Sequence, residues 1–138
     1  MIEESAARYD VSPALLTLVT RLLWFHTSPA PLPTSPLHVV SSHELFLSLE
    51  HHLEKYPPQW VAATSRALED VLSALPEGVL QGGVTPEVAL GWGARLNANG
   101  YGLQEYNGGE DGALGVGLFP AAAMLNHSCA PNCVMVFK

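Results

Sequence analysis

Apolar side chains recur at intervals of three and four residues along the first part of the chain, which predicts a series of helices. The first clear helix begins at Ser12 and Pro13, because serine is a favoured N-cap and proline suits the first helical position. The apolar residues that follow fall on one face of this helix: Leu15, Leu18, Val19, Leu22 and Leu23. A face of this kind packs against a protein core.

Two further helices are predicted on either side of the pair Pro57-Pro58. Ser41 and Glu44 have the spacing of a capping box, so they start the earlier helix. Its aligned apolar positions are Leu45, Leu49 and Leu53. Pro57-Pro58 ends that helix and starts the later one, since proline is tolerated only in a first helical turn. The apolar positions of the later helix are Trp60, Ala67, Leu68, Val71, Leu72 and Leu75.

A fourth helix is predicted to begin at Thr85-Pro86-Glu87, where a capping residue again precedes a proline. Its apolar face should carry Val88, Trp92 and Leu96. Three tryptophans stand at helical positions along the chain, and all three are expected in the core: Trp24, Trp60 and Trp92. We therefore expect about four helices before the pattern changes.

Short apolar runs separated by polar and glycine-rich segments follow the fourth helix. Tyr101–Leu103 and Gly115–Phe119 predict two strands, joined by the polar loop Gln104–Gly112. Pro120–Leu125 predicts a single helical turn, and Cys133–Phe137 predicts a third strand.

Two regions result from this pattern, a helical region at residues 1–98 and a β-containing region at 99–138. The fold class is therefore α+β. Four prolines at 28–40 predict a loop within the helical region. The third predicted strand stands directly before Lys138, and an apolar strand needs a neighbour to pair with. We therefore expect the chain to be part of a longer protein.

Composition excludes several functional classes. Hydrophobic residues make up 48% and charged residues 14%, which is typical of one folded domain rather than a disordered segment. The net charge of −7 disfavours contact with phosphate backbones, so no direct nucleic-acid partner is expected. The longest apolar stretch, Ala14–Phe25, is too short to cross a bilayer and contains Arg21, so no membrane partner is expected. Two cysteines and an acidic N-terminus indicate the cytoplasm, the nucleus or both.

The stretch with the most chemical information is Leu125–Cys133, which reads Leu-Asn-His-Ser-Cys-Ala-Pro-Asn-Cys. From its residue types alone it is a polar turn between two apolar segments. Asparagine and serine side chains in such turns hydrogen-bond to the nearby backbone.

This motif resembles the Asn-His-Ser-Cys-x-Pro-Asn sequence of SET-domain protein methyltransferases at every fixed position. The run Gly115–Pro120, followed by Ala-Ala-Ala-Met-Leu, is similar to the approach to that motif in SMYD-like (SET and MYND) members. The helical region resembles, in pattern only, the helical insert inside the SET fold of this family. The resemblance implies an incomplete SET fold, in which short strands and a knot-forming segment follow the insert.

The resemblance also implies a set of contacts to the cofactor S-adenosyl-L-methionine. Asn126 and His127 match residues that contact it, and Leu125 matches a neighbouring position that does so through its backbone. Asn99 is similar to an asparagine that also reaches the cofactor, with Asn97 as the alternative in register. From residue types alone, Asn99 is equally well explained as a helix C-cap, because asparagine tolerates the left-handed conformation.

Structural zinc in the full-length protein is a further implication, with Cys129 in the position of a family ligand. Structural zinc takes four ligands, and in the family the other three come from a cysteine-rich segment after the SET core. The 138 residues contain no such segment, and Cys129 and Cys133 cannot complete a site by themselves. We therefore expect Cys129 to bind metal only where those cysteines are supplied. The zinc-binding MYND finger would need more cysteines than this chain has.

The implied function of the parent protein is S-adenosylmethionine-dependent N-methylation of lysine side chains in a protein substrate, histone or non-histone. The catalytic tyrosines of the family follow a Gly-Glu-Glu-Leu-like segment that is absent here, so no catalytic residue is assigned. The chain itself is therefore expected to be inactive. Two alternatives stay open: a non-catalytic SET-like protein-interaction module, and another SET group such as the Rubisco methyltransferases. Cys129 disfavours the second, because that group resembles Asn-His-Ser without the zinc cysteine.

Overall fold

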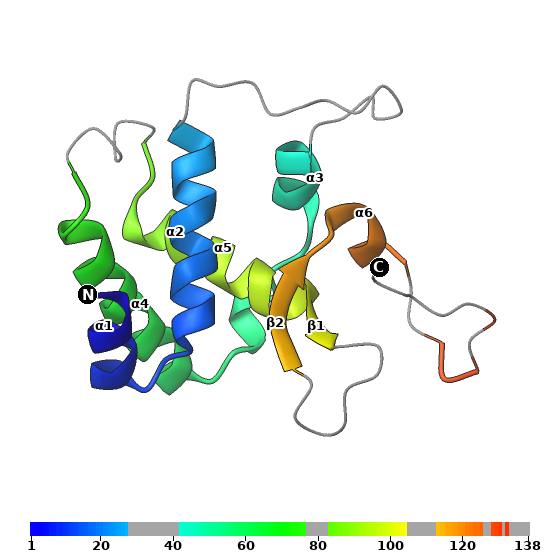
Figure 1. The fold of residues 1–138 in the computed structure, drawn as a ribbon, viewed down its shortest axis with the longest axis horizontal. Coiled ribbons are helices and arrows are strands. Elements are labelled where there is room, and N and C mark those ends of the chain that lie inside the picture. The colour runs from blue at the N-terminus through cyan, green and yellow to red at the C-terminus, as the bar shows by residue number, and fades with distance from the viewer. Residues whose placement is uncertain (28–41, 77–82, 105–112, 126–127, 131, 133–138) are drawn as a thin grey trace.

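Most of the described residues lie in helices, and every helix except the short α6 precedes a small antiparallel sheet (Figure 1). The computed structural model describes residues 1–27, 42–76, 83–104, 113–125, 128–130 and 132. The elements are α1 (Ile2–Tyr9), α2 (Pro13–Thr27), α3 (Ser42–Ser48), the short 3-10 helix η1 (Leu53–Lys55), α4 (Pro58–Ser73), α5 (Pro86–Asn99), β1 (Gly100–Gln104), β2 (Ala113–Leu118) and α6 (Pro120–Ala123).

The starts of α2 and α5 lie where their capping residues predict them. Ser12 Oγ accepts a hydrogen bond from the Leu15 backbone N–H at 3.4 Å, and α2 begins at the next residue. Thr85 Oγ1 accepts from the Val88 N–H at 3.4 Å ahead of α5. Such caps satisfy backbone donors that the first helical turn leaves unpaired, so the sequence fixes these boundaries locally.

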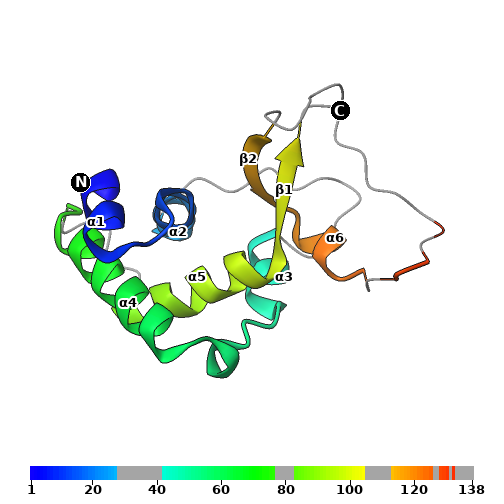
Figure 2. The same cartoon turned by 90° about the horizontal axis from the view of Figure 1, so that it is seen from below.

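The core lies where α2, α4 and α5 meet, with α1 packed on α2 and α4 (Figures 1 and 2). Its main buried side chains are Leu16, Val19, Leu23, Ala67, Leu68, Val71, Ala89, Trp92 and Leu96. Each fully buried leucine stabilises the fold by about 1.5–3 kcal/mol. The predicted faces were right in outline, but Val88 is 41% exposed and Trp24 is 59% exposed, so neither belongs to the core.

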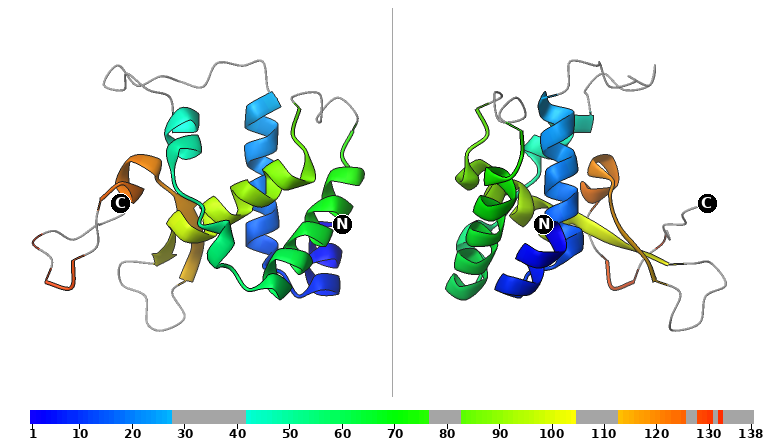
Figure 3. Two further views of the ribbon diagram at one scale, coloured as in Figure 1. Left: turned by 180° about the vertical axis from the view of Figure 1, so that it is seen from behind. Right: turned by 60° about the vertical axis from the view of Figure 1, so that its left-hand side comes forward.

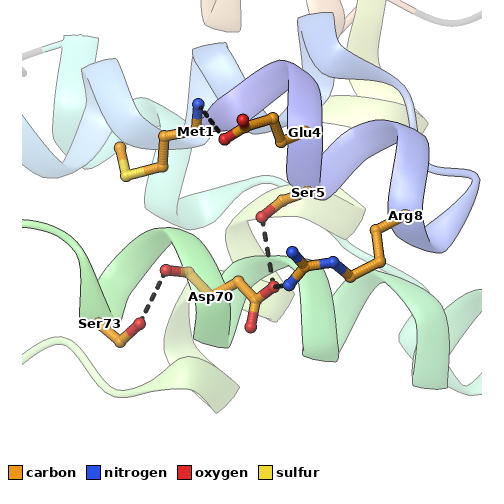
Figure 4. Close-up of polar contacts among 6 residues, drawn as sticks. All are labelled: Met1, Glu4, Ser5, Arg8, Asp70 and Ser73. Carbon is orange, nitrogen blue, oxygen red and sulfur yellow. Dashed lines mark hydrogen bonds and ion pairs between the residues drawn. The ribbon is translucent and has the colours of Figure 1, made fainter.

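Helix α1 is an element that the apolar pattern did not predict. It contributes few apolar side chains to the core, and it is fixed to α4 by polar contacts that Figure 4 shows. Arg8 Nη1 donates to Asp70 Oδ2 at 2.8 Å, and Ser5 Oγ donates to the same oxygen at 3.5 Å. Asp10 ends α1 in the left-handed conformation with φ 54°. The partner carboxylate is distant in sequence, which is why local periodicity missed this helix.

Helix α3 is shorter than predicted. It ends at Ser48, whose hydroxyl donates to the Leu45 carbonyl at 2.7 Å, so the expected continuation to Leu53 was wrong. His52 has a φ of 48°, a left-handed conformation that interrupts a helix, and Leu53 begins the separate η1. The capping position Ser41 lies outside the described residues.

The two predicted strands are present, and they pair as a hairpin. β1 and β2 pair antiparallel with Gly100 opposite Leu118 and Leu103 opposite Gly115, and a register shift lies between Leu103 and Gln104. The strands project from the C-terminal end of α5, and α6 lies beside α3 (Figures 2 and 3). Three predicted segments lie outside the described residues: most of the loop Gln104–Gly112, the proline-rich loop 28–40 and the strand Cys133–Phe137.

The predicted helical turn after the hairpin is present as α6. The described elements are helices and one two-stranded sheet, and the α+β class, the SET fold and the division at residues 98 and 99 stay predictions. Across the described ranges, every helix is too short or too polar to cross a membrane.

Candidate functional site

The candidate site begins at Asn99, the last residue of α5. Its side-chain nitrogen Nδ2 donates to the Glu50 carbonyl and to the Arg95 carbonyl, both at 2.9 Å. Arg95 Nε in turn donates to the Leu49 carbonyl at 2.9 Å. The end of α5 is therefore bound to the chain that follows α3 by two side chains, and both amide hydrogens of Asn99 are engaged.

The conformation of Asn99 contradicts the C-cap explanation. In the described chain, the non-glycine residues with positive φ are Asp10 and His52. The helix instead passes directly into the extended Gly100, with φ −74° and ψ 148°. A Cβ atom on Gly100 would lie 2.6 Å from the Leu96 carbonyl oxygen, so this junction is built for glycine.

The hairpin register places two parts of the predicted site at one end of the sheet. Because Gly100 pairs with Leu118, Asn99 enters the hairpin at the end where Phe119 and Pro120 leave it. The chain that leaves is α6, which leads to Leu125 and then to the motif (Figure 1). The topology thus brings Asn99 and the approach to the motif to the same end of the hairpin, although they are more than twenty residues apart.

Asn97, the alternative to Asn99, belongs to another contact. Its Nδ2 donates to the Tyr56 hydroxyl at 3.2 Å, and that hydroxyl donates to the Ala94 carbonyl at 3.3 Å. The Tyr56 ring stacks on Trp60 with centroids 4.3 Å apart. Asn97 therefore connects α5 to Tyr56, which ends η1, whereas Asn99 connects α5 to the chain directly after α3.

Part of the motif can be placed. Leu125 is 73% exposed, and its backbone N–H donates to the Ala122 carbonyl at 3.0 Å. Ser128 Oγ accepts from the Ala130 N–H at 3.3 Å, which is the serine-to-backbone bond that the turn predicted. Asn126 and His127 lie outside the described residues, so their cofactor contacts stay predictions.

Cys129, the predicted zinc ligand, is exposed. Cys133 lies outside the described residues. Within the ranges that the structure describes, no group of three or more His, Cys, Asp and Glu side chains is placed to hold a metal ion. The zinc role of Cys129 therefore stays a prediction.

An apolar groove of about 340 Å³ lies beside the hairpin end, between it and α2. It is lined by Leu18, Arg21, Leu22, Phe25, His43, Phe46, Leu96, Leu118 and Pro120. Arg21 and His43 are its polar side chains among the described residues, and neither is an acidic acceptor for an ammonium or sulfonium group. The groove is therefore largely apolar, and we assign no cofactor pocket to the described residues.

Comparison with known proteins relates part of the chain to lysine methyltransferases. Over 43 residues, which are 31% of this chain and 8% of the relative, it is 43% identical to histone-lysine N-methyltransferase Smyd1 of Mus musculus. The same figures hold for SMYD1 of Homo sapiens. Over 45 residues, 33% of this chain and 10% of the relative, it is 40% identical to N-lysine methyltransferase SMYD2-A of Xenopus laevis.

The likeness is to SMYD lysine methyltransferases. It covers about a third of the chain, and the chain covers only 8–10% of the length of these relatives. No family model matches the sequence. No solved structure matches it.

Proposed function

We propose that these 138 residues belong to an S-adenosylmethionine-dependent protein-lysine N-methyltransferase of the SMYD-like SET kind. The observation that carries the proposal is the identity of 40–43% with SMYD lysine methyltransferases over 43–45 residues. The motif Asn-His-Ser-Cys-Ala-Pro-Asn at 126–132 supports it, because a purely structural turn does not require this combination of side chains.

Asn126 and His127 are the residues that would hold the cofactor, together with the backbone of Leu125. The Asn126 amide offers donors and an acceptor to a zwitterionic amino acid, and the His127 backbone can pair with an adenine edge. Asn99 would act from the neighbouring end of the hairpin through its side-chain oxygen or its backbone, because both of its amide hydrogens are engaged. Its position supports this role, because the register of β1 and β2 places it where the chain leaves toward the motif.

The chemistry that the cofactor supplies is an electrophilic methyl group, which a lysine amine accepts in its neutral form. The partner in this proposal is therefore a protein with an accessible lysine, in the cytoplasm, the nucleus or both. The catalytic tyrosines and the remaining zinc ligands would come from other parts of the parent protein. Cys129 would then be one of four zinc ligands.

A graft into mouse Smyd1 tests the proposal. Residues 115–132 would replace the aligned segment of that enzyme, and cofactor binding would be measured by calorimetric titration. We expect the graft to bind S-adenosylmethionine, and Asn126→Ala within it to weaken binding by about 1–3 kcal/mol, the usual cost of leaving a buried polar group without its partner. Met124→Ala is the matched control, because Met124 is close in sequence, 54% exposed and assigned no cofactor contact.

Two outcomes would contradict the proposal. One is unchanged affinity in a folded Asn126→Ala graft, which would remove the cofactor role of the motif. The other is a graft that folds without binding the cofactor, which would favour the non-catalytic interaction module instead.

A further inference from the structure

Two histidines from different helices contact each other at the edge of the core. His26 lies in the last turn of α2 and His43 in the first turn of α3. His26 Nδ1 and His43 Nε2 are 3.1 Å apart, which is hydrogen-bond distance. Their rings meet the Trp92 indole edge-on, at centroid distances of 5.3 Å and 6.1 Å. Trp92 is only 3% exposed, so the pair stands between a buried indole and solvent.

The His26–His43 contact matters for the stability of α3, because α3 is a short helix. Seven residues do not form a stable helix by themselves in water, so α3 depends on its packing. Phe46, 1% exposed, and Leu49 supply its apolar anchor, and the histidine pair supplies the polar contact to α2. The carbonyls of Leu49 and Glu50, directly after α3, accept from Arg95 and Asn99. The docking of α3 is therefore coupled to the position of Asn99.

The protonation state of the two imidazoles decides whether the hydrogen bond between His26 and His43 can form. With no proton or one proton added, one ring nitrogen can donate and the other can accept. With both imidazoles protonated, every ring nitrogen is a donor, no acceptor is left, and two like charges face each other.

Other charged groups near the pair act in opposite directions. Glu44 on α3 favours the protonated form of His43, whereas Arg21 of α2 lines the same groove as His43 and adds positive charge. From α5 the pair faces the uncharged Trp92, and α6, which packs against α3, consists of proline and alanine.

We propose that the His26–His43 pair is a pH-sensitive contact that holds α3 in place near neutral pH and releases it when both imidazoles are protonated. This inference stands independently of the methyltransferase assignment, because it rests only on the contacts of α2, α3 and α5.

The direction of the pH dependence follows from His43. Burial lowers the pKa of His43 below its ordinary value of 6.5, the neighbouring His26 lowers it further, and Glu44 opposes both. The folded state therefore binds this proton less tightly than the unfolded state does. The stabilisation is fully present above the ordinary pKa and is lost as the pH falls below it.

Amide hydrogen exchange of the 138-residue chain, followed by NMR between pH 7.5 and pH 5, tests the proposal. We expect the α3 amides, after correction for intrinsic exchange, to lose protection relative to the α4 amides as the pH falls below the ordinary histidine pKa. His26→Gln should weaken this pH dependence, because glutamine can hydrogen-bond to His43 without gaining a proton, whereas the burial of His43 still lowers its pKa. His51→Asn is the control and should keep the dependence, since asparagine can replace the acceptor that His51 Nδ1 presents to the Leu53 N–H.

Protection of α3 that does not change with pH, or that changes equally in His26→Gln, would overturn the proposal. If His26→Gln loses α3 protection at all pH values, His43→Phe gives a second measurement. Phenylalanine keeps an aromatic ring beside Trp92 and cannot be protonated, so α3 protection should then be independent of pH. A pH dependence that persists in His43→Phe would also overturn the proposal.

Discussion

At the scale of single residues, Thr64 stands out because its buried hydroxyl lacks a hydrogen-bond partner among the described residues. It lies within α4 and is 0% exposed. A buried hydroxyl without a partner costs free energy, because it has lost its bonds to water. We expect Thr64→Val, which has a similar shape and no hydroxyl, to raise the free energy of unfolding by about 1 kcal/mol. Urea denaturation measures this change.

Thr20→Val is the matched control for Thr64→Val. Thr20 also lies within a helix, but its hydroxyl donates to the Leu16 carbonyl at 2.8 Å. The same substitution should therefore give no gain at this position. A stability that falls in Thr64→Val would mean that the hydroxyl is bonded in solution.

Residue types predicted the backbone contact of Ser128 but not the side-chain contacts of Asn99. The bond from Ser128 to the backbone is local, so the turn composition was enough to predict it. Asn99 was ambiguous between a cofactor contact and a C-cap, because its acceptor at Glu50 is 49 residues away. No periodicity or spacing contains that information. The same limit applies to the His26–His43 pair, which the sequence did not reveal.

At the scale of elements, Gly93 within α5 and Gly100 at the junction of α5 with β1 should respond oppositely to an added methyl group. A Cβ atom at Gly93 would lie 3.7 Å from Val19 and 4.0 Å from Thr64, which is ordinary contact distance. Gly93→Ala should therefore raise the free energy of unfolding by about 0.5–1 kcal/mol through helix propensity. A Cβ atom at Gly100 would lie 2.6 Å from the Leu96 carbonyl oxygen, which is a clash with backbone. Gly100→Ala should destabilise the fold by about 1–3 kcal/mol.

Thermal denaturation of the two variants checks this pair of predictions. Each serves as the control of the other, because the same methyl group is added on the same stretch of chain. Equal effects of the two substitutions would show that α5 and β1 do not join as the structure has them. If Gly100→Ala disrupts the junction of α5 and β1, it should also displace Asn99, which directly precedes Gly100.

The sequence predicted the elements that nearby residues determine, and it missed those that depend on contacts with distant parts of the chain. α2, α4 and α5 begin where proline and, for α2 and α5, a side-chain cap place them, and the hairpin follows from its apolar runs. α1 was missed, because a carboxylate of α4 fixes it from far along the chain. Trp24 was placed in the core on the grounds of its residue type, although its position around α2 turns it to solvent. Tertiary packing decided both cases.

At the scale of the whole molecule, apolar side chains remain exposed where the hairpin leads to the motif. Val116 is 46% exposed, Phe119 37%, Met124 54% and Leu125 73%. These side chains are available to contact other parts of the longer protein that we propose. This agrees with a chain that covers only 8–10% of the length of its SMYD relatives.

The 138-residue chain by itself should therefore show no methyl transfer and no tight cofactor binding. Asn126, His127 and Asn99 would form one wall of a pocket, and each hydrogen bond contributes only about 0.5–1.5 kcal/mol net. Micromolar affinity needs about 8 kcal/mol, so this wall is insufficient alone. The assay incubates the purified chain with labelled S-adenosylmethionine and histone, with mouse Smyd1 as the positive control. Turnover that disappears in the His127→Ala variant would contradict the prediction, because it would show that these residues contain a complete site.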